Sequence, residues 1–241
     1  ATAEAAFIGR MYHASVVFND KMWVIGGAYV ESASNYKNRN DVWYSVDGNN
    51  WSMATAEAGF RVRSGHAVVV FNNKMYLIGG ASFESGAFVS RLNDIWSSPD
   101  GISWTSEVIS APFSTRAAHN CVVYNNKIWV IGGFNGASFL RDVWYSSDGI
   151  NWNNATSAAA FSGRGGHTSL VFNNKIWVVG GDEGSTPFQN DAWTSNNGAV
   201  WTQEAYTGFS GRRYHTSVAS NEIWVIGGYS YGDLNDVWRY P

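Results

Sequence analysis

Residues 164–181 read RGGHTSLVFNNKIWVVGG, and this stretch decides the fold. Two short runs rich in apolar and β-branched residues flank the pair Asn173-Asn174, which predicts two strands joined by a turn. Asparagine tolerates the positive φ angles that a two-residue hairpin turn requires. The stretch therefore predicts a β-hairpin whose second strand ends at the glycine pair Gly180-Gly181.

This pattern occurs five times along the chain, at histidine spacings of 53, 53, 48 and 48 residues. Each copy has an arginine three residues before the histidine, then a Gly-Gly pair and an Asp-x-Trp, and four copies close with Gly-x-x-Trp. The arginines are Arg10, Arg63, Arg116, Arg164 and Arg212; the histidines are His13, His66, His119, His167 and His215; the aspartates are Asp41, Asp94, Asp142, Asp191 and Asp236. The sequence is thus one array of repeats, approximately 7–53, 60–106, 113–154, 161–203 and 209–241.

The first repeat illustrates the strands that we expect in each unit. Residues 13–18, 21–25 and 41–45 form three strands, and Trp51 lies on a fourth after a tight turn at Asp47-Gly48. The apolar spacing is near two throughout, so no helix is predicted. All 13 tryptophans fall at repeated positions, and we assign them to packing between neighbouring repeats.

The order of these motifs resembles the kelch repeat over essentially the whole chain. The resemblance implies an all-β, five-bladed kelch-like β-propeller with four-stranded antiparallel blades, which would make residues 1–241 a single domain. The segment from Ser45 to Trp51 also looks like the Asp-box turn of sialidase-type propellers, although it is one residue shorter. The fifth repeat stops at Trp238-Arg239-Tyr240-Pro241, so we expect its blade to have three strands or the tail of a fourth. If the ring is not closed, the exposed strand edge would permit self-association.

Composition excludes several classes of protein. The net charge of −3 argues against nucleic acid as the main partner, because phosphate binding needs a concentrated basic surface. No apolar run approaches the length of a membrane span, and residues 1–10 show no signal-peptide pattern. The single cysteine, Cys121, excludes an intramolecular disulfide and a cysteine-rich metal site.

The charged residues that recur in every repeat are expected to be structural. No second histidine lies beside any of the five, so the spacing typical of metal ligands is missing, and we predict neither a metal ion nor another cofactor. One arginine and one aspartate per repeat instead predict a repeated ion pair that holds loops together.

Residues that depart from the repeat are the better candidates for ligand binding. Arg61 and Arg213 have no counterpart in the other repeats, and aromatic residues gather in the connections between strands two and three and around the Arg-x-x-His segments. Such aromatics beside guanidinium groups suit stacking on sugar rings or clamping an anionic peptide. The candidate ligand-binding residues are Arg61, Arg213, Tyr12, Tyr214, Tyr36, Phe83, Phe134 and Tyr231.

We therefore predict a non-enzymatic interaction module whose strand 2–3 and 4–1 loops present a face for a peptide or partner protein. Three alternatives stay open: a lectin-like carbohydrate-binding propeller, a sugar-processing enzyme such as a mutarotase, and an engineered or excised propeller without a native ligand. Catalysis has little support, since each histidine fills the same repeated position and no Ser-His-Asp arrangement is indicated. The compartment stays open between the cytoplasm and export.

Overall fold

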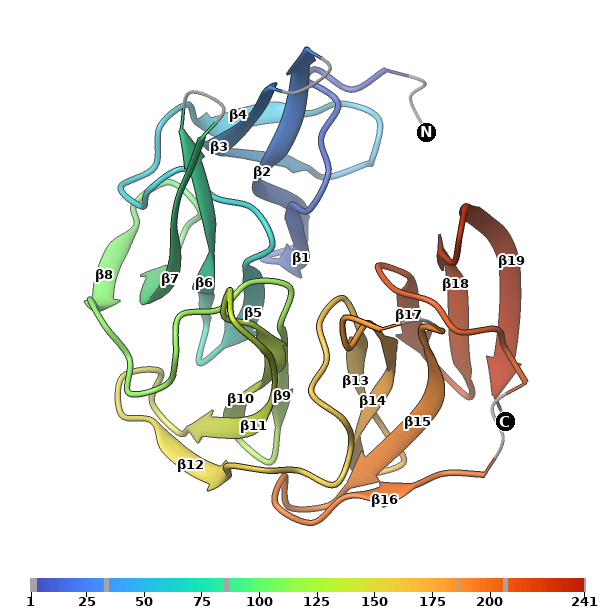
Figure 1. Ribbon diagram of the computed structural model, residues 1–241. Helices are drawn as coiled ribbons and strands as arrows, with labels where there is room; N and C mark the ends of the chain where they lie inside the picture. The colour runs from blue at the N-terminus through green and yellow to red at the C-terminus, as the bar shows by residue number, and fades with distance from the viewer. Residues whose placement is uncertain (1–3, 33–34, 85–86, 186, 206–207, 241) are drawn as a thin grey trace. The chain divides into compact units, whose positions relative to one another are not determined.

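The structure is a computed structural model, and it describes residues 4–32, 35–84, 87–185, 187–205 and 208–240. These residues form five antiparallel sheets (Figure 1), and the chain divides into two compact units, Ala1–Ala117 and Ala118–Pro241. Nowhere do the described residues form a helix that is long and apolar enough to cross a membrane. The all-β fold class predicted from the sequence is confirmed, with one sheet for each repeat.

The first unit contains two four-stranded sheets in sequence order. Their strands are β1 (Ala14–Phe18), β2 (Lys21–Ser32), β3 (Asn35–Ser45) and β4 (Ser52–Thr55), followed by β5 (Ala67–Phe71), β6 (Lys74–Glu84), β7 (Ala87–Ser98) and β8 (Thr105–Val108). Strand β1 lies beside β5, so the first strands of the two blades are neighbours.

The second unit contains three sheets. The first has β9 (Asn120–Tyr124), β10 (Lys127–Phe134), β11 (Phe139–Ser146) and β12 (Asn153–Thr156); the second has β13 (Thr168–Phe172), β14 (Lys175–Gly181), β15 (Gln189–Ser195) and β16 (Thr202–Gln203); the third has β17 (Thr216–Ala219), β18 (Ile223–Tyr229) and β19 (Asp233–Tyr240). Strand β13 lies beside both β9 and β17. The fifth blade has three strands among the described residues, as the sequence predicted.

The turns between the first two strands of each blade agree with the sequence. Asn173 and Asn174 have φ angles of 48° and 55°, and the equivalent residues of the other repeats that carry an Asn pair or Asn-Asp do the same. The fifth repeat has Ser220-Asn221 there instead, where the Ser220 amide donates to Glu222 O. Because a left-handed pair matches the twist of the flanking strands, these residues fix the hairpin register.

The prediction that the second strand ends at the glycine pair is confirmed in the fourth blade, where β14 ends at Gly181, and is wrong in the other four blades. Strand β2 continues through Gly26 and Gly27 to Ser32, with a shift of register between Ile25 and Gly27 that marks a β-bulge. Because of this bulge, β2 and β3 pair again beyond it, and much of the segment predicted as a loop between them is strand.

The turn before the fourth strand also differs from the prediction. Gly48 alone of the pair has a positive φ, 73°, whereas Asp47 uses its Oδ1 to accept the backbone N–H groups of Asn49 and Asn50, both at 2.8 Å. The connection is an Asx turn rather than a two-residue hairpin. Trp51 lies in this connection, just before β4, and not on the strand.

Neighbouring blades are joined by the glycine pair of one and the histidine of the next. A Cβ atom on Gly26, which has a φ of +57°, would lie 3.0 Å from Cε1 of His66, and a Cβ on Gly180 would lie 2.9 Å from Cε1 of His215. The second glycine donates a hydrogen bond to the following blade, as from Gly27 N to Arg63 O at 2.9 Å. Glycine is therefore required at both positions of the pair, because φ is positive there and the next blade leaves no space for a Cβ atom.

The apolar cores lie between adjacent blades. In the first unit, Trp23 and Ile25 of β2 pack with Met75 and Leu77 of β6. The tryptophans are buried or half-buried as predicted, except that Trp238 on β19 is exposed over 37% of its surface. No fourth strand of the described chain pairs with β19, which explains this difference.

Candidate functional site

The repeated arginine and aspartate form a bidentate ion pair within the first, second, fourth and fifth blades. Arg164 donates to Asp191 Oδ1 at 2.6 Å and to Asp191 Oδ2 at 3.0 Å, and also to Gly180 O at 2.9 Å. The indole of Trp193 donates to Asp191 Oδ2 at 2.7 Å. The same pairing joins Arg10 to Asp41, Arg63 to Asp94 and Arg212 to Asp236.

This arrangement accounts chemically for the Arg-x-x-His and Asp-x-Trp motifs. Burial by itself would raise the pKa of Asp191, but the hydrogen bonds from Arg164 and Trp193 hold it below its ordinary value. Arg116 is fully buried as well, and Asp142 accepts the indole N–H of Trp144 at 2.7 Å. We infer that these charges stabilise the blades and do not bind ligand.

Four of the five histidines are buried, and His13 is exposed. Three of the buried ones, His66, His167 and His215, lie against the first glycine of the preceding blade's pair. Burial, followed by the charge of the nearby arginine, lowers the pKa of His66, His167 and His215 to about 3. These three imidazoles are therefore neutral at pH 7. Across the described chain, no three His, Cys, Asp or Glu side chains gather in a group that could hold a metal ion.

The residue before each histidine has a left-handed backbone, with φ between 54° and 62°. The five residues are Tyr12, Gly65, Ala118, Gly166 and Tyr214. Their peptide groups link neighbouring blades: Gly65 N donates to Tyr12 O at 2.8 Å, and Tyr214 N donates to Gly166 O at 2.7 Å. The positive φ is required because it aims these groups at the next blade.

Tyrosine at this position carries a cost in conformational free energy, because its backbone is left-handed. A left-handed conformation costs a residue with a Cβ about 1–2 kcal/mol, and such outliers persist mainly where surrounding structure or function demands them. Tyr12 and Tyr214 are each 46% exposed, so burial of their rings does not explain the choice of residue. Both tyrosines are thus stronger functional candidates than exposure alone would make them.

Tyr214 belongs to a cluster of aromatic residues around a second, unrepeated ion pair. Arg213 Nη1 donates to Asp182 Oδ2 at 2.5 Å. The guanidinium carbon lies 4.8 Å from the ring centroid of Phe188, 5.3 Å from that of Tyr229 and 5.4 Å from that of Tyr214. These distances are within the range of cation–π attraction.

Tyr231 completes this group by stacking on Phe188, with ring centroids 5.8 Å apart and an interplanar angle of 30°. Tyr231 is 69% exposed and Tyr229 39%, whereas Asp182 is buried. We call these residues the Arg213 cluster: Asp182, Phe188, Arg213, Tyr214, Tyr229 and Tyr231. The cluster presents aromatic surface to solvent around Arg213 and Asp182, whose opposite charges neutralise each other.

Phe134 lies on the neighbouring blade of the same unit. Its ring stacks with Phe139 at a centroid distance of 4.8 Å. Phe139 in turn lies against the loop that carries Asp182, since a Cβ on Gly184 would be 2.9 Å from Phe139 Cε2. The apolar surface therefore continues from the Arg213 cluster towards β10.

The other candidates lie on separate elements of the first unit. Tyr12 precedes β1, Tyr36 is on β3 with 45% of its surface exposed, and Phe83 is on β6. Arg61, between β4 and β5, donates to Ser90 Oγ at 3.2 Å. The idea that one ligand face joins these residues to the Arg213 cluster stays a prediction.

Sequence reasoning left three members of the cluster outside its set of candidates: Asp182, Phe188 and Tyr229. A signal for Asp182 does exist in the sequence, because the residue after the glycine pair is uncharged in the other four repeats. An unrepeated acid in one repeat and an unrepeated arginine in the next indicate a contact between the two.

Comparison with known proteins agrees with this architecture. The model of the KLHDC2/KLHL20/DRC7 Kelch-repeats domain matches residues 12–155. Among solved structures, the one titled "Structure of YjhT" is similar with a TM-score of 0.79 and 21% identity, over 97% of this chain and 82% of that one. At this identity the similarity concerns the fold.

Two curated relatives match about half of this chain. "Putative protein tag-53" of Caenorhabditis elegans is 30% identical over 138 residues, which is 53% of this chain and 10% of that protein. "Leucine-zipper-like transcriptional regulator 1 homolog" of Drosophila melanogaster is 30% identical over 141 residues, 55% of this chain and 14% of that protein. Each match spans a small part of a much longer protein. Together with the matching family model and the repeated motifs, they show that this chain belongs to the kelch-repeat family.

Proposed function

We propose that this chain is a non-enzymatic binding module and that the Arg213 cluster is a ligand face for a peptide segment of a partner protein. Kelch propellers act in general as protein-interaction modules, which supports the class of function. The observation that carries the location is the set of exposed tyrosine rings packed around the Arg213–Asp182 pair, two of them, Tyr214 and Tyr231, with a positive φ.

The chemistry of the cluster favours an uncharged or weakly charged ligand surface. Asp182 already neutralises Arg213, so an anionic group would have to compete with a carboxylate 2.5 Å away. Tyr214 and Tyr231 offer flat rings that lose little conformational entropy on binding. We expect stacking on apolar or proline side chains to supply most of the affinity, which then depends weakly on salt.

Selection from a random peptide library provides the test. The affinity of a selected peptide is measured by fluorescence anisotropy against the native chain and the variants Tyr231→Ala and Tyr214→Gly. Each variant should weaken binding at least tenfold. Ile150→Ala is the matched control, because Ile150 is similarly exposed but lies in the turn between β11 and β12, outside every candidate site. Peptides that bind all four proteins equally would refute the proposed face.

Carbohydrate is the second candidate, and one feature of the cluster favours it. Exposed tyrosine rings beside a carboxylate and a guanidinium resemble the combination of stacking and paired hydrogen bonds that holds sugar rings. A glycan array separates the two ligand classes. Binding to a glycan that is lost in Tyr231→Ala, without any selected peptide, would replace the peptide proposal.

A further inference from the structure

A hydroxyl group crosses the interface between the fourth and fifth blades. Thr168 on β13 places its Oγ1 3.0 Å from Nε2 of His215 and 2.6 Å from Oγ of Ser217 on β17. The equivalent residues, each directly after the repeated histidine, are Ala14, Ala67, Asn120 and Thr216. Between the first and second blades, Ala14 has no polar side chain, and neither ring nitrogen of His66 has a hydrogen-bond partner among the described residues. Thr168 therefore bonds the histidine of the next blade in a way that Ala14 cannot.

Both neutral tautomers of His215 keep Thr168 bonded on both sides. Burial lowers the pKa of His215 to about 3, so at pH 7 only one of its ring nitrogens carries a proton. If Nε2 is the acceptor, the Thr168 hydroxyl donates to it and accepts from Ser217. If Nε2 carries the proton, the hydroxyl accepts from it and donates to Ser217. In either case the hydroxyl fixes the position of the imidazole relative to β13.

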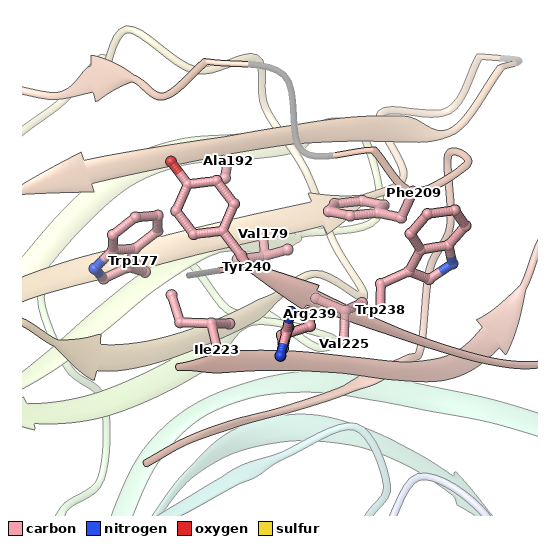
Figure 2. Close-up of a pocket in the computed structure, with 9 residues that line it drawn as sticks. All are labelled: Trp177, Val179, Ala192, Phe209, Ile223, Val225, Trp238, Arg239 and Tyr240. Atoms are coloured by element: carbon pink, nitrogen blue, oxygen red, sulfur yellow. The ribbon is translucent and has the colours of Figure 1, made fainter. Parts of the chain in front are cut away.

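An apolar core also joins these two blades. Trp177 and Val179 of β14 pack in one cluster with Ile223 and Val225 of β18 (Figure 2). Such contacts hold sheets together but have no preferred direction, whereas a hydrogen bond requires its donor and acceptor to be aligned. We therefore expect the blades to stay packed without the Thr168 hydroxyl, and we expect the orientation of the imidazole to depend on it.

His215 directly follows Tyr214, whose backbone is left-handed with a φ of 55°. The Tyr214 amide donates to Gly166 O at 2.7 Å, and a Cβ on Gly166 would lie 2.9 Å from Tyr214 Cε1, so the ring lies over this glycine. On its other side Tyr214 follows Arg213, whose guanidinium is bound to Asp182. A left-handed backbone persists where the surrounding structure over-determines it. Here both neighbours of Tyr214 are anchored by side chains of the fourth blade.

We propose that Thr168 is a positioning residue for the Arg213 cluster: through His215 it holds Tyr214 against Gly166, with the ring in the place where a ligand meets it. The part of this inference that concerns a ligand rests on the proposed function of the cluster, whereas the hold on Tyr214 does not. Loss of the hydroxyl lets the imidazole turn, and the Tyr214 amide then breaks its hydrogen bond to Gly166 more often.

Hydrogen exchange of single backbone amides, followed by NMR, tests this hold directly. In Thr168→Val the Tyr214 amide should exchange at least tenfold faster than in the native chain, because valine keeps the shape of threonine and removes the hydroxyl. Thr168→Ser should restore most of the protection. Ser169→Ala is the matched control on the same strand, because the buried Ser169 Oγ has no hydrogen-bond partner among the described residues. This control should leave the exchange rate of Tyr214 unchanged.

The Gly65 amide is the internal reference for this experiment. It donates to Tyr12 O at 2.8 Å within the first unit, and its exchange rate should be the same in all variants. The proposal is overturned if Thr168→Val leaves the exchange rate of Tyr214 unchanged. It is also overturned if the variant accelerates Gly65 as strongly as Tyr214, because the hydroxyl would then contribute only to general stability.

A peptide whose binding requires Tyr231 connects Thr168 to the ligand face. Such a peptide should bind Thr168→Val at least fivefold more weakly than Ser169→Ala, and equal binding to these two variants would overturn the link between Thr168 and the ligand. Failure of the proposed function gives a different result. In that case no selected peptide requires Tyr231, yet Thr168→Val still accelerates the exchange of the Tyr214 amide, and the hold on Tyr214 stands.

Discussion

The fourth and fifth blades carry the same motifs in the same order, yet their side chains are buried to different degrees. In the fourth blade Asp191 is 13% exposed and lies in its ion pair with Arg164; in the fifth, Asp236 is 35% exposed in the equivalent pair with Arg212. Trp193 is half-buried, whereas Trp238 is exposed over 37% of its surface. The difference shows that the motif fixes the hydrogen bonds within a blade. The neighbouring strand determines how far the side chains that form these bonds are exposed to solvent.

Acid should produce the largest effect, through the interfaces that the fourth blade shares with its neighbours. His167 and His215 have a pKa of about 3 when folded and 6.5 as the reference value, so the folded state holds them neutral. Their contribution to stability is complete above pH 6.5 and is lost as the pH falls towards 3, by up to about 1.4 kcal/mol per pH unit for each histidine. Urea midpoints at pH 7.5, 6 and 5 should fall steadily.

His13 supplies the control for this acid effect. Desolvation and then the charge of Arg10 also lower the pKa of His13, but its side chain is more exposed than that of His167, so His13→Gln should change the slope of stability against pH less than His167→Gln does. A urea midpoint that is the same at pH 7.5 and pH 5 would contradict the neutral, buried histidines.

Removal of the arginine sharpens the comparison of the two ion pairs. Arg164→Met leaves the carboxylate of Asp191 nearly buried and unpaired, which should cost about 3–5 kcal/mol of unfolding free energy. Arg212→Met should cost about 2 kcal/mol, because water reaches Asp236. Equal losses in chemical denaturation would mean that the missing fourth strand does not matter to the pair.

Truncation of the Asp-x-Trp indole tests the same difference in the apolar layer. Trp193→Ala removes a ring that packs against Phe161 and should cost about 3 kcal/mol. Trp238→Ala should cost about 1 kcal/mol, because less apolar surface is buried there. If calorimetry shows a larger loss of unfolding free energy for Trp238→Ala than for Trp193→Ala, the proposed difference between the two blades is wrong.

The smallest effect is expected at the junction of these blades, where Tyr214 has a φ of 55°. Tyr214→Gly should change the unfolding free energy by less than about 1 kcal/mol, because relief of backbone strain offsets the lost contact with Arg213. Tyr145→Gly, on strand β11, should cost clearly more. A large loss of stability in Tyr214→Gly would indicate that this tyrosine is structural.

Much of the blade could be predicted from sequence because its determinants are local. The Asn173-Asn174 turn, the pairing of Arg164 with Asp191 and the absence of a fourth strand in the fifth blade all follow from residues within one repeat. The expectation that the glycine pair ends its strand was confirmed for β14 but was wrong for β2, which continues to Ser32, because pairing beyond a bulge depends on the register with the adjacent strand.

The candidate site was harder to predict. Arg213, Tyr214 and Tyr231 were identified because they break the repeat, but their partners Asp182 and Phe188 belong to the preceding repeat. Which loops contact each other depends on how two blades pack. The pattern within a single repeat does not encode the distance between residues of different repeats.

The sequence by itself determined the number of blades, the hairpin turns and the residues of each ion pair, because left-handed turns and bidentate pairs are set by neighbours along the strand. Tertiary structure alone decided that His215 lies against Gly180, that the rings of Phe188 and Tyr229 surround Arg213, and that 37% of the surface of Trp238 is exposed. Burial and desolvation depend on what the next blade supplies, and that surface forms only when the sheets pack together.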